Sequence, residues 1–362
     1  MPEKNTRTRG FKSQLAEILK EHAGASERRR GKAAGGLTAN KRWQVLFQSF
    51  EELRGLGYKL ENPRNFRLKH MRALVPHWES KNLAPSTIQN KISILRVFAG
   101  WIGKPDMIPA TEALTSTPEA GRRSYAASID KSWEGNGVDC AEQVERIRQL
   151  DPRMALQVEL AAAFGLRVGE SWHVRPAADI VPLGKDGYSL RLLEGTKGKR
   201  LRHVPVESER QEDVLGRARQ LAGNGSMMPP GRTEAEWRNH YYWILRKLGI
   251  TRKEMGVTMH GLRHQYVHGQ YLARLGVDVP VKGGGDTLLS KDEAGRQKHF
   301  IAENLGHSRP SIVTAYSGSK RSVKKPRLDW GVKPGSGSEN KPDSGSECGT
   351  DGQPGATPDP QD

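Results

Sequence analysis

The sequence has few of the features that mark secreted or membrane proteins. Two cysteines occur among its 362 residues, Cys140 and Cys348, which is too few for a disulfide framework or a cysteine-ligated zinc site. The longest apolar run, residues 160–166, is far shorter than the roughly 20 residues of a membrane-spanning helix. The first residues, Met-Pro-Glu-Lys-Asn-Thr-Arg, lack the apolar stretch of a secretion signal. These absences predict a soluble, cytoplasmic protein that binds no membrane.

Acidic residues are scarce relative to basic ones. The chain has 41 Asp and Glu against 58 Lys and Arg, which gives a formal net charge of +17. Clustered basic side chains gain free energy by releasing counterions from phosphates. We therefore expect a polyanionic partner, with double-stranded DNA as the first candidate. The hydrophobic content of 35% is enough for ordinary cores if part of the chain is linker or tail.

Composition divides the chain into five segments. Residues 1–36 carry nine basic and four acidic side chains and are expected to form a flexible basic arm. Residues 37–114 have helical periodicity and predict a helical DNA-binding domain. Residues 115–138 are rich in Ser, Thr, Pro and Gly, as in an interdomain linker, and residues 139–330 form a second domain. Residues 331–362, made largely of Gly, Ser, Pro and acidic side chains, predict a disordered tail.

The patterns predict a mainly α fold with a small β-hairpin or sheet, in the α+β class. Apolar residues recur at helical spacing in two sets, Trp43, Leu46, Phe47, Phe50 and Leu53, then Ile88, Ile92, Leu95 and Phe98. A β-hairpin is expected from Tyr188–Leu193 and Leu201–Val206, with residues 194–198 as its turn. Four basic side chains of the first domain are candidate contacts to a DNA backbone, although each alone is more often a plain surface charge: Lys41, Arg42, Lys91 and Arg96.

Two motifs of the second domain place charged residues in turns. In Gly165-Leu166-Arg167-Val168-Gly169-Glu170, Arg167 and Glu170 follow an apolar helix at a tight turn. Taken alone, this pair is more often a structural salt bridge than a functional one. Lys197 lies in the Gly-flanked hairpin turn, where a lysine is usually a surface charge but can also deliver an amine into a phosphate site.

A third motif is His260-Gly261-Leu262-Arg263-His264. Its spacing of three places His260 and Arg263 on one face of a helix. His260, His264 and His268 also have the i, i+4, i+8 spacing of metal ligands on a helix. The zinc-protease pattern, however, needs Glu at position 261, where this chain has Gly, so a metal site is disfavoured and no cofactor is expected.

The fourth motif is Leu305-Gly306-His307-Ser308, which is followed nine residues after His307 by Tyr316. Together the four motifs resemble those of the tyrosine recombinase, or phage integrase, family. Lys197 fits the family better than Lys199 does, because its eight-residue step to Pro205 is typical of the family. The stretch from Arg263 to His307 is longer than usual, and its residues 283–298 look like an inserted loop. Six catalytic residues occur in the family's order: Arg167, Lys197, His260, Arg263, His307 and Tyr316.

The resemblance implies a helical core-binding domain and a catalytic domain that cut and rejoin DNA without metal or ATP. Tyr316 would attack the phosphodiester to form a 3′-phosphotyrosyl link, with His260 as general base and Lys197 as general acid. Arg167 and Arg263 stay charged and would stabilise the phosphate together with His307, while Glu170 would orient one of these side chains.

The family also implies a homotetramer on paired DNA sites, accessory DNA-bending or excision factors, and a bacterial or phage-derived mobile element. The implied function is that of a site-specific recombinase or integrase. A type IB topoisomerase shares the phosphotyrosine chemistry and is one alternative. A DNA-binding regulator without catalysis is the other, but none of the six residues is missing.

Overall fold

The structure is a computed structural model, and it describes residues 10–24, 35–185, 187–196 and 200–320. Lys197 and the tail predicted for residues 331–362 lie outside the described residues. The buried apolar side chains form two clusters, one from Phe11 to Leu114 and one from Trp133 to Tyr316. We call these the helical unit and the catalytic unit. No described helix is both long and apolar enough to cross a membrane.

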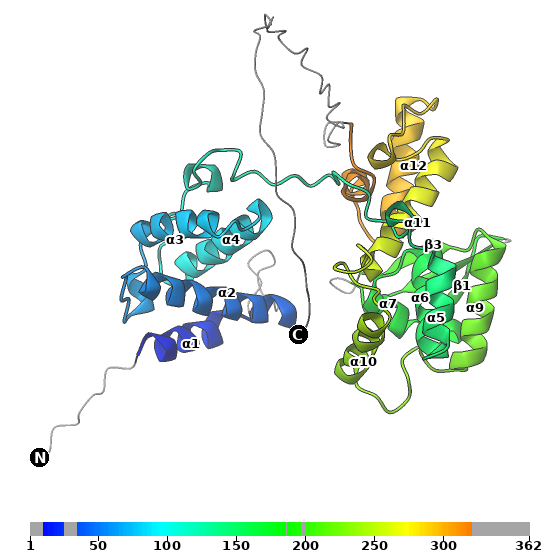
Figure 1. The fold of residues 1–362 in the computed structure, drawn as a ribbon, viewed down its shortest axis with the longest axis horizontal. Helices are drawn as coiled ribbons and strands as arrows, with labels where there is room; N and C mark the ends of the chain where they lie inside the picture. Colours follow the sequence, from blue (N-terminus) through cyan, green and yellow to red (C-terminus); the bar gives the residue numbers. More distant parts are fainter. Residues whose placement is uncertain (1–9, 25–34, 186, 197–199, 321–362) are drawn as a thin grey trace, which may run out of the picture. The chain divides into compact units, whose positions relative to one another are not determined.

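Helices alone build the helical unit (Figure 1). Its aromatic core contains Phe50, Phe66 and Phe98, with ring centroids 5.6 to 5.9 Å apart. Phe50 and Phe98 belong to the two apolar sets that the sequence periodicity assigned to helices. The elements are α1 (Phe11–His22), α2 (Gly36–Gly55), η1 (Pro63–Asn65), α3 (Leu68–Ser80), α4 (Pro85–Trp101) and η2 (Thr111–Ala113).

The prediction that residues 1–36 form a flexible arm is wrong for residues 11–22, which form α1. One face of this helix is buried in the core of the helical unit through Phe11, Leu15, Ile18 and Leu19. The ring of Phe11 stacks on Phe50 with a centroid distance of 6.3 Å. The abundance of basic residues in this segment concealed a short amphipathic helix, whose apolar positions recur every three to four residues.

Three of the four basic residues proposed for DNA contact are held inside the helical unit. Arg42 is buried and donates a hydrogen bond to the carbonyl of Ala23 at 2.8 Å. Lys91 is buried over the Trp78 ring and pairs with Glu52 at 3.3 Å, and burial lowers its pKa despite that pair. Arg96 is half-buried and donates to the carbonyl of Ile108 at 3.3 Å. The burial of Arg42 and Lys91 therefore argues against DNA contact by these two side chains. DNA contact by Arg96 stays a prediction, and Lys41 is the exposed member of the set.

The catalytic unit combines helices with a three-stranded antiparallel sheet. Helix α6 (Pro152–Phe164) packs against α5 (Cys140–Arg148), α9 (Glu209–Ala222) and α11 (Met259–Leu275) (Figure 1). The predicted hairpin is confirmed as β2 (Gly187–Leu192) and β3 (Arg202–Pro205), in which Leu190 pairs with Val204. Strand β1 (Ile180–Leu183), which the sequence patterns did not indicate, pairs with β2. The fold is thus mainly α with a small sheet, as predicted.

The other elements of this unit follow the motifs closely. Helix α7 begins directly after Arg167, and α11 carries His260 and Arg263. These elements are η3 (Glu134–Asn136), α5 (Cys140–Arg148), α7 (Val168–His173), α8 (Pro176–Asp179), α9 (Glu209–Ala222), α10 (Glu234–Lys247), α11 (Met259–Leu275), η4 (Pro280–Lys282), α12 (Lys291–Asn304), η5 (Pro310–Val313) and α13 (Thr314–Ser317).

Two predicted boundaries shift in the structure. The expected linker, residues 115–138, ends inside the catalytic core, because Trp133 is fully buried and its Nε1 donates to the carbonyl of Thr258 at 2.8 Å. The stretch expected to be an inserted loop includes the first half of α12, which begins at Lys291. Ser290 caps this helix by accepting from the backbone N–H of Glu293.

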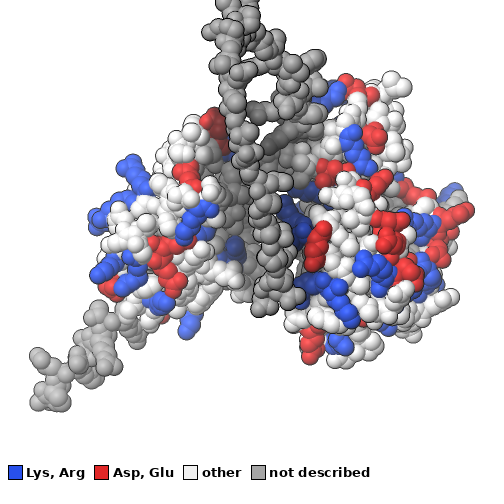
Figure 2. Space-filling model, viewed as in Figure 1, with Lys and Arg blue, Asp and Glu red and all other residues white. Residues whose placement is uncertain are grey.

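Charge alone does not mark a DNA-binding face. Figure 2 shows lysines and arginines interspersed with acidic side chains on the visible face of the catalytic unit. A basic surface contributes affinity for phosphates without selecting a reaction. The distribution of charge on this face therefore does not by itself identify a functional site.

Candidate active site

Arg167 lies at the start of α7, directly after a turn that only glycine fits. Gly165 ends α6 with a left-handed backbone, φ +59°, and a Cβ at this position would overlap the Tyr266 ring. Arg167 is the N-cap residue of α7, and its backbone N–H donates to Glu170 Oε2 at 2.7 Å. The turn therefore fixes where the Arg167 side chain leaves the backbone.

Glu170 is the buried acid at the centre of three arginines. Its carboxylate is fully buried and accepts from Arg167 Nη1 and from Arg202 Nη2, each at 2.5 Å. Arg263 Nη1 lies 3.7 Å from the same carboxylate. Burial opposes ionisation of Glu170, but the charges of Arg202, Arg263 and Arg167 outweigh it and hold the pKa of the carboxyl below its ordinary value. Glu170 thus stays charged and fixes the arginines.

Arg202 belongs to this site and was not among the predicted residues. It is buried on β3, donates to the backbone carbonyl of Asn304, and burial lowers its pKa to about 10. A signal for it exists in the sequence, because alternate residues of a strand face the same side and Val204, two positions on, is buried. The predicted hairpin therefore already implied an inward-facing Arg202.

Arg263 joins the segments that build the site. Its side chain is 0% exposed. It donates to the carbonyls of Gly165 and Leu305 at 2.6 and 2.5 Å, and Nε donates to the hydroxyl of Tyr316 at 3.1 Å. One guanidinium thereby connects the ends of α6 and α12 with the tyrosine of α13.

Tyr316 is buried beside the histidines of α11. Its side chain is 6% exposed, and its ring centroid lies 5.0 Å from that of His264 and 5.8 Å from that of His260. The structure therefore brings Tyr316, Arg263 and His260 together, although His260 and Tyr316 lie more than fifty residues apart in the sequence.

The predicted histidines of the site are held in the neutral form. His260 is exposed to solvent, but desolvation by the surrounding protein atoms and the charges of Arg263 and Arg167 lower its pKa to about 4. His307 is half-buried, and desolvation with the charges of Arg263, Arg167 and Arg202 lowers its pKa to about 4 as well. Both rings are therefore neutral at pH 7, with one nitrogen able to accept a proton and the other able to donate a hydrogen bond.

The described part of the hairpin turn packs on the start of α7. Gly195 has φ +70°, and a Cβ there would lie 2.6 Å from the carbonyl oxygen of Gly169. Lys197, the predicted general acid, follows two residues later outside the described residues. The close approach of Gly195 holds this end of the turn next to the Arg167 segment.

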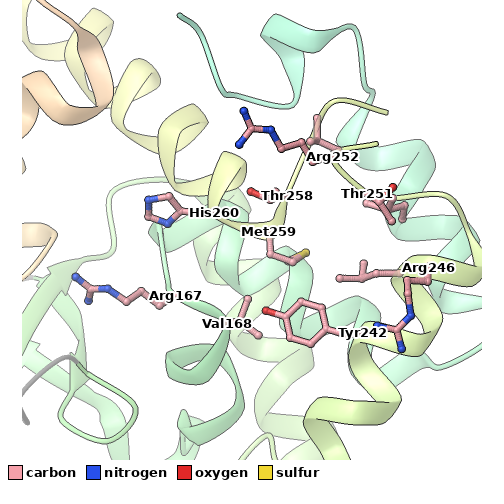
Figure 3. Close-up of a pocket in the computed structure, with 12 residues that line it drawn as sticks. Arg167, Val168, Tyr242, Arg246, Thr251, Arg252, Thr258, Met259 and His260 are labelled. Atoms are coloured by element: carbon pink, nitrogen blue, oxygen red, sulfur yellow. The ribbon is translucent and has the colours of Figure 1, made fainter. Parts of the chain in front are cut away.

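An open pocket of about 470 Å³ adjoins Arg167 and His260. Figure 3 shows these two side chains at one end of the pocket and Tyr242 and Arg246 at the other. Arg252 also lines it, so that the guanidiniums of Arg167, Arg246 and Arg252 all border the pocket. Within the described ranges, no group of three His, Cys, Asp or Glu side chains is placed to hold a metal ion.

Acid should destabilise the protein through His264. Burial and the neighbouring His260 and His268 lower the pKa of His264 to about 4, whereas the unfolded chain has the ordinary value of 6.5. The unfolded state therefore binds more protons between these values, and stability falls as the pH drops from about 6.5 to about 4, by roughly 2–3 kcal/mol for this one group. In His264→Leu, the difference in unfolding free energy between pH 7 and pH 4.5, measured with urea, should shrink by this amount. An unchanged difference would contradict the assignment.

Comparisons with known proteins agree with this architecture. Residues 25–108 match the family model described as phage integrase, N-terminal. The structure is similar to XerH site-specific recombinase bound to a palindromic difH substrate in a post-cleavage complex, with 15% identity and a TM-score of 0.51. This match covers 85% of this chain and 82% of that one. It is also similar to a lambda integrase tetramer bound to a Holliday junction, with 15% identity, a TM-score of 0.53, and coverage of 89% and 81%. A search of curated proteins found no match.

The chain therefore has the fold of the tyrosine recombinases, as the motif resemblance implied. The family-model match falls in the helical unit, where the sequence motifs were least specific. All the described members of the predicted catalytic set lie in the catalytic unit.

Proposed function

We propose that this protein is a site-specific DNA recombinase or integrase that breaks and rejoins DNA through Tyr316. One observation carries the proposal: the Tyr316 hydroxyl accepts a hydrogen bond from the buried Arg263 in a site that also holds a neutral His260. Phosphoryl transfer to a tyrosine can use these groups together: the phenol attacks, the neutral imidazole accepts its proton, and the guanidinium stabilises negative charge.

The chemistry follows from these groups. The oxygen of Tyr316 attacks phosphorus, its proton passes to His260, and the bond from phosphorus to the 5′ oxygen breaks. Lys197 gives a proton to the departing 5′ oxygen, which leaves a 3′-phosphotyrosyl link and a free 5′ hydroxyl. The reverse reaction with another 5′ hydroxyl rejoins the strand and requires no ATP, because the phosphoester bond is conserved.

Arg167 and Arg263 have different roles in this mechanism. Arg167 has a side chain that is 25% exposed at the pocket, and it is the guanidinium that a nonbridging phosphate oxygen reaches. Arg263 places a positive charge next to the Tyr316 hydroxyl and holds the phenol in position through its hydrogen bond. His307 donates a hydrogen bond to the same phosphate, and Glu170 orients Arg167.

We further propose double-stranded DNA as the partner and a homotetramer on paired sites as the active assembly. Similarity to the lambda integrase tetramer on a Holliday junction and to the XerH–difH complex supports both. The setting would be the cytoplasm of a bacterium, on DNA of a mobile element, with accessory DNA-bending or excision factors.

Strand exchange between two DNA duplexes tests the proposed function. The duplexes are taken from the flanks of the gene, one of them is labelled, and chelator is present while ATP is absent. Recombinant products of both parents are expected. Supercoil relaxation without exchange would identify a type IB topoisomerase, and tight site-specific binding without cleavage would identify a noncatalytic regulator.

A further inference from the structure

The segment that precedes the catalytic unit packs against the segment that carries Tyr316. The backbone N–H of Ala127 donates to the carbonyl of Thr314 at 2.9 Å. A Cβ at Gly318 would lie 2.9 Å from the carbonyl oxygen of Ala127, so the two backbones are in close contact there. Residues on both sides of Tyr316 are thus held by residues that the sequence assigned to a linker.

His268 lies between these two segments. Its side chain is buried on α11, and Nε2 lies 3.1 Å from the backbone carbonyl of Tyr316. Since a carbonyl can only accept, Nε2 must carry the proton. The other nitrogen, Nδ1, is buried without a hydrogen-bond partner and lies 3.7 Å from the carboxylate of Asp130. Burial lowers the pKa of His268, so the ring is neutral, and of these two contacts only the one from Nε2 to the main chain of the predicted nucleophile is a hydrogen bond.

The Asp130 carboxylate is itself fixed by a tight turn. Its Oδ1 accepts from the backbone N–H of Ser132 at 2.8 Å. A Cβ at Gly135 would overlap this carboxylate, so glycine is required for the turn to close over it. The Asp130 carboxylate is therefore held in place by its own turn.

We propose that His268 is a positioning residue that holds Tyr316 for attack on DNA. This proposal rests on the function proposed above. Helix α13 spans only Thr314–Ser317, and a single turn has no stability of its own. Tyr316 is instead anchored at both ends, with Arg263 on its hydroxyl and His268 on its carbonyl.

The main-chain anchor matters because nucleophilic attack depends on position. A displacement of about 1 Å at a reacting group costs about 100-fold in rate. Without the His268 hydrogen bond, the main chain at Tyr316 is held less tightly, and the phenol can shift about its contact with Arg263. The effect should fall on the cleavage step rather than on DNA affinity.

Single-turnover cleavage of nicked DNA tests this role with two matched substrates. One carries the normal 5′ oxygen at the scissile phosphate, and the other carries sulfur, which leaves without a proton. In His268→Leu we expect adduct formation to slow by about 100-fold on both substrates, while DNA affinity stays within about twofold. His268→Gln, whose amide can still donate to the Tyr316 carbonyl, should recover most of the rate.

Asp130→Asn separates charge from local structure. The amide oxygen can still accept from Ser132, so the turn is kept, while the charge that faces His268 is lost. We expect cleavage within about twofold of the wild type on both substrates, because the hydrogen bond from His268 Nε2 to the Tyr316 carbonyl does not involve Asp130. The control is His240→Leu, which breaks a histidine–aspartate pair with Asp151 (2.9 Å) on another side of the catalytic unit and should leave cleavage unchanged.

Three results would overturn the positioning role. Unchanged cleavage in His268→Leu would remove it directly. If the His268→Leu variant cleaved the sulfur substrate at the wild-type rate but not the oxygen substrate, His268 would act in protonation of the leaving group instead. Equal losses in His268→Leu, His268→Gln and His240→Leu, with parallel falls in melting temperature, would indicate a structural role only. Failure of the wild-type protein to form any adduct while it binds DNA would instead refute the proposed function.

Discussion

Replacement of Tyr316 by Phe should abolish covalent attachment to DNA and leave DNA affinity within about twofold of the wild type. The phenol oxygen is the attacking atom, whereas affinity comes mainly from phosphate contacts along the duplex. The variant leaves Arg263 Nε without its partner in a buried position, so a modest loss of stability, about 1–3 kcal/mol, should accompany it. Denaturing gels measure the adduct, and filter binding or anisotropy measures the affinity.

Tyr241→Phe is the matched control for this result. Tyr241 is also buried in the catalytic unit, and its hydroxyl has only a weak contact to the sulfur of Met259, at 3.8 Å. It should keep the adduct. Retention of the adduct in Tyr316→Phe, or equal losses of binding and cleavage, would show that Tyr316 is not the nucleophile.

Replacement of Arg167 by Ala should reduce the cleavage rate by about 100-fold to 1,000-fold with little loss of stability. The side chain is partly exposed at the pocket and is the guanidinium best placed to meet a phosphate, where one missing donor typically costs this much. Glu170 keeps Arg202 at 2.5 Å and Arg263 at 3.7 Å, so its buried charge remains compensated. Single-turnover cleavage and thermal unfolding measure the two effects separately.

Arg202→Met is the matched control for Arg167→Ala, because it removes the other arginine that pairs closely with Glu170. Arg202 is buried against the same carboxylate, so its loss leaves a buried charge with weaker partners and should destabilise the protein by roughly 3–5 kcal/mol. If Arg167→Ala lowered the melting temperature as strongly as Arg202→Met, the pair of Arg167 and Glu170 would be structural and its catalytic assignment would fail.

The motifs that lie at helix ends and turns were predictable from the sequence. Gly165, Gly306 and Gly318 all have positive φ values, and each precedes or follows a predicted catalytic residue by one or two positions. Because local backbone geometry and short spacings define these motifs, they could be recognised without tertiary information. The hairpin was predictable for the same reason, since its strands alternate and its turn is rich in glycine.

Burial of charged residues was not predictable in this way. Lys91 lies three residues after Ile88 and Arg42 four before Leu46, which is the spacing of the buried face, but charged side chains are usually exposed. Glu52 and the carbonyl of Ala23 hold the two side chains inside the helical unit. Their partners lie 39 and 19 residues away, and nothing local marks them. The hydrogen bond from His268 to the Tyr316 carbonyl depends in the same way on a contact between distant segments.

Identifying the amino acid that becomes joined to DNA tests the proposed role of Tyr316 most directly. Nicked duplexes from the flanks of the gene, on which cleavage releases a short strand and prevents religation, are incubated with the wild-type protein in excess chelator. The covalent complex is then digested and its peptide identified by mass spectrometry. We expect a nucleotide on Tyr316, attached through a 3′ phosphate. An adduct on any other residue, or no adduct despite tight site-specific binding, would contradict the account.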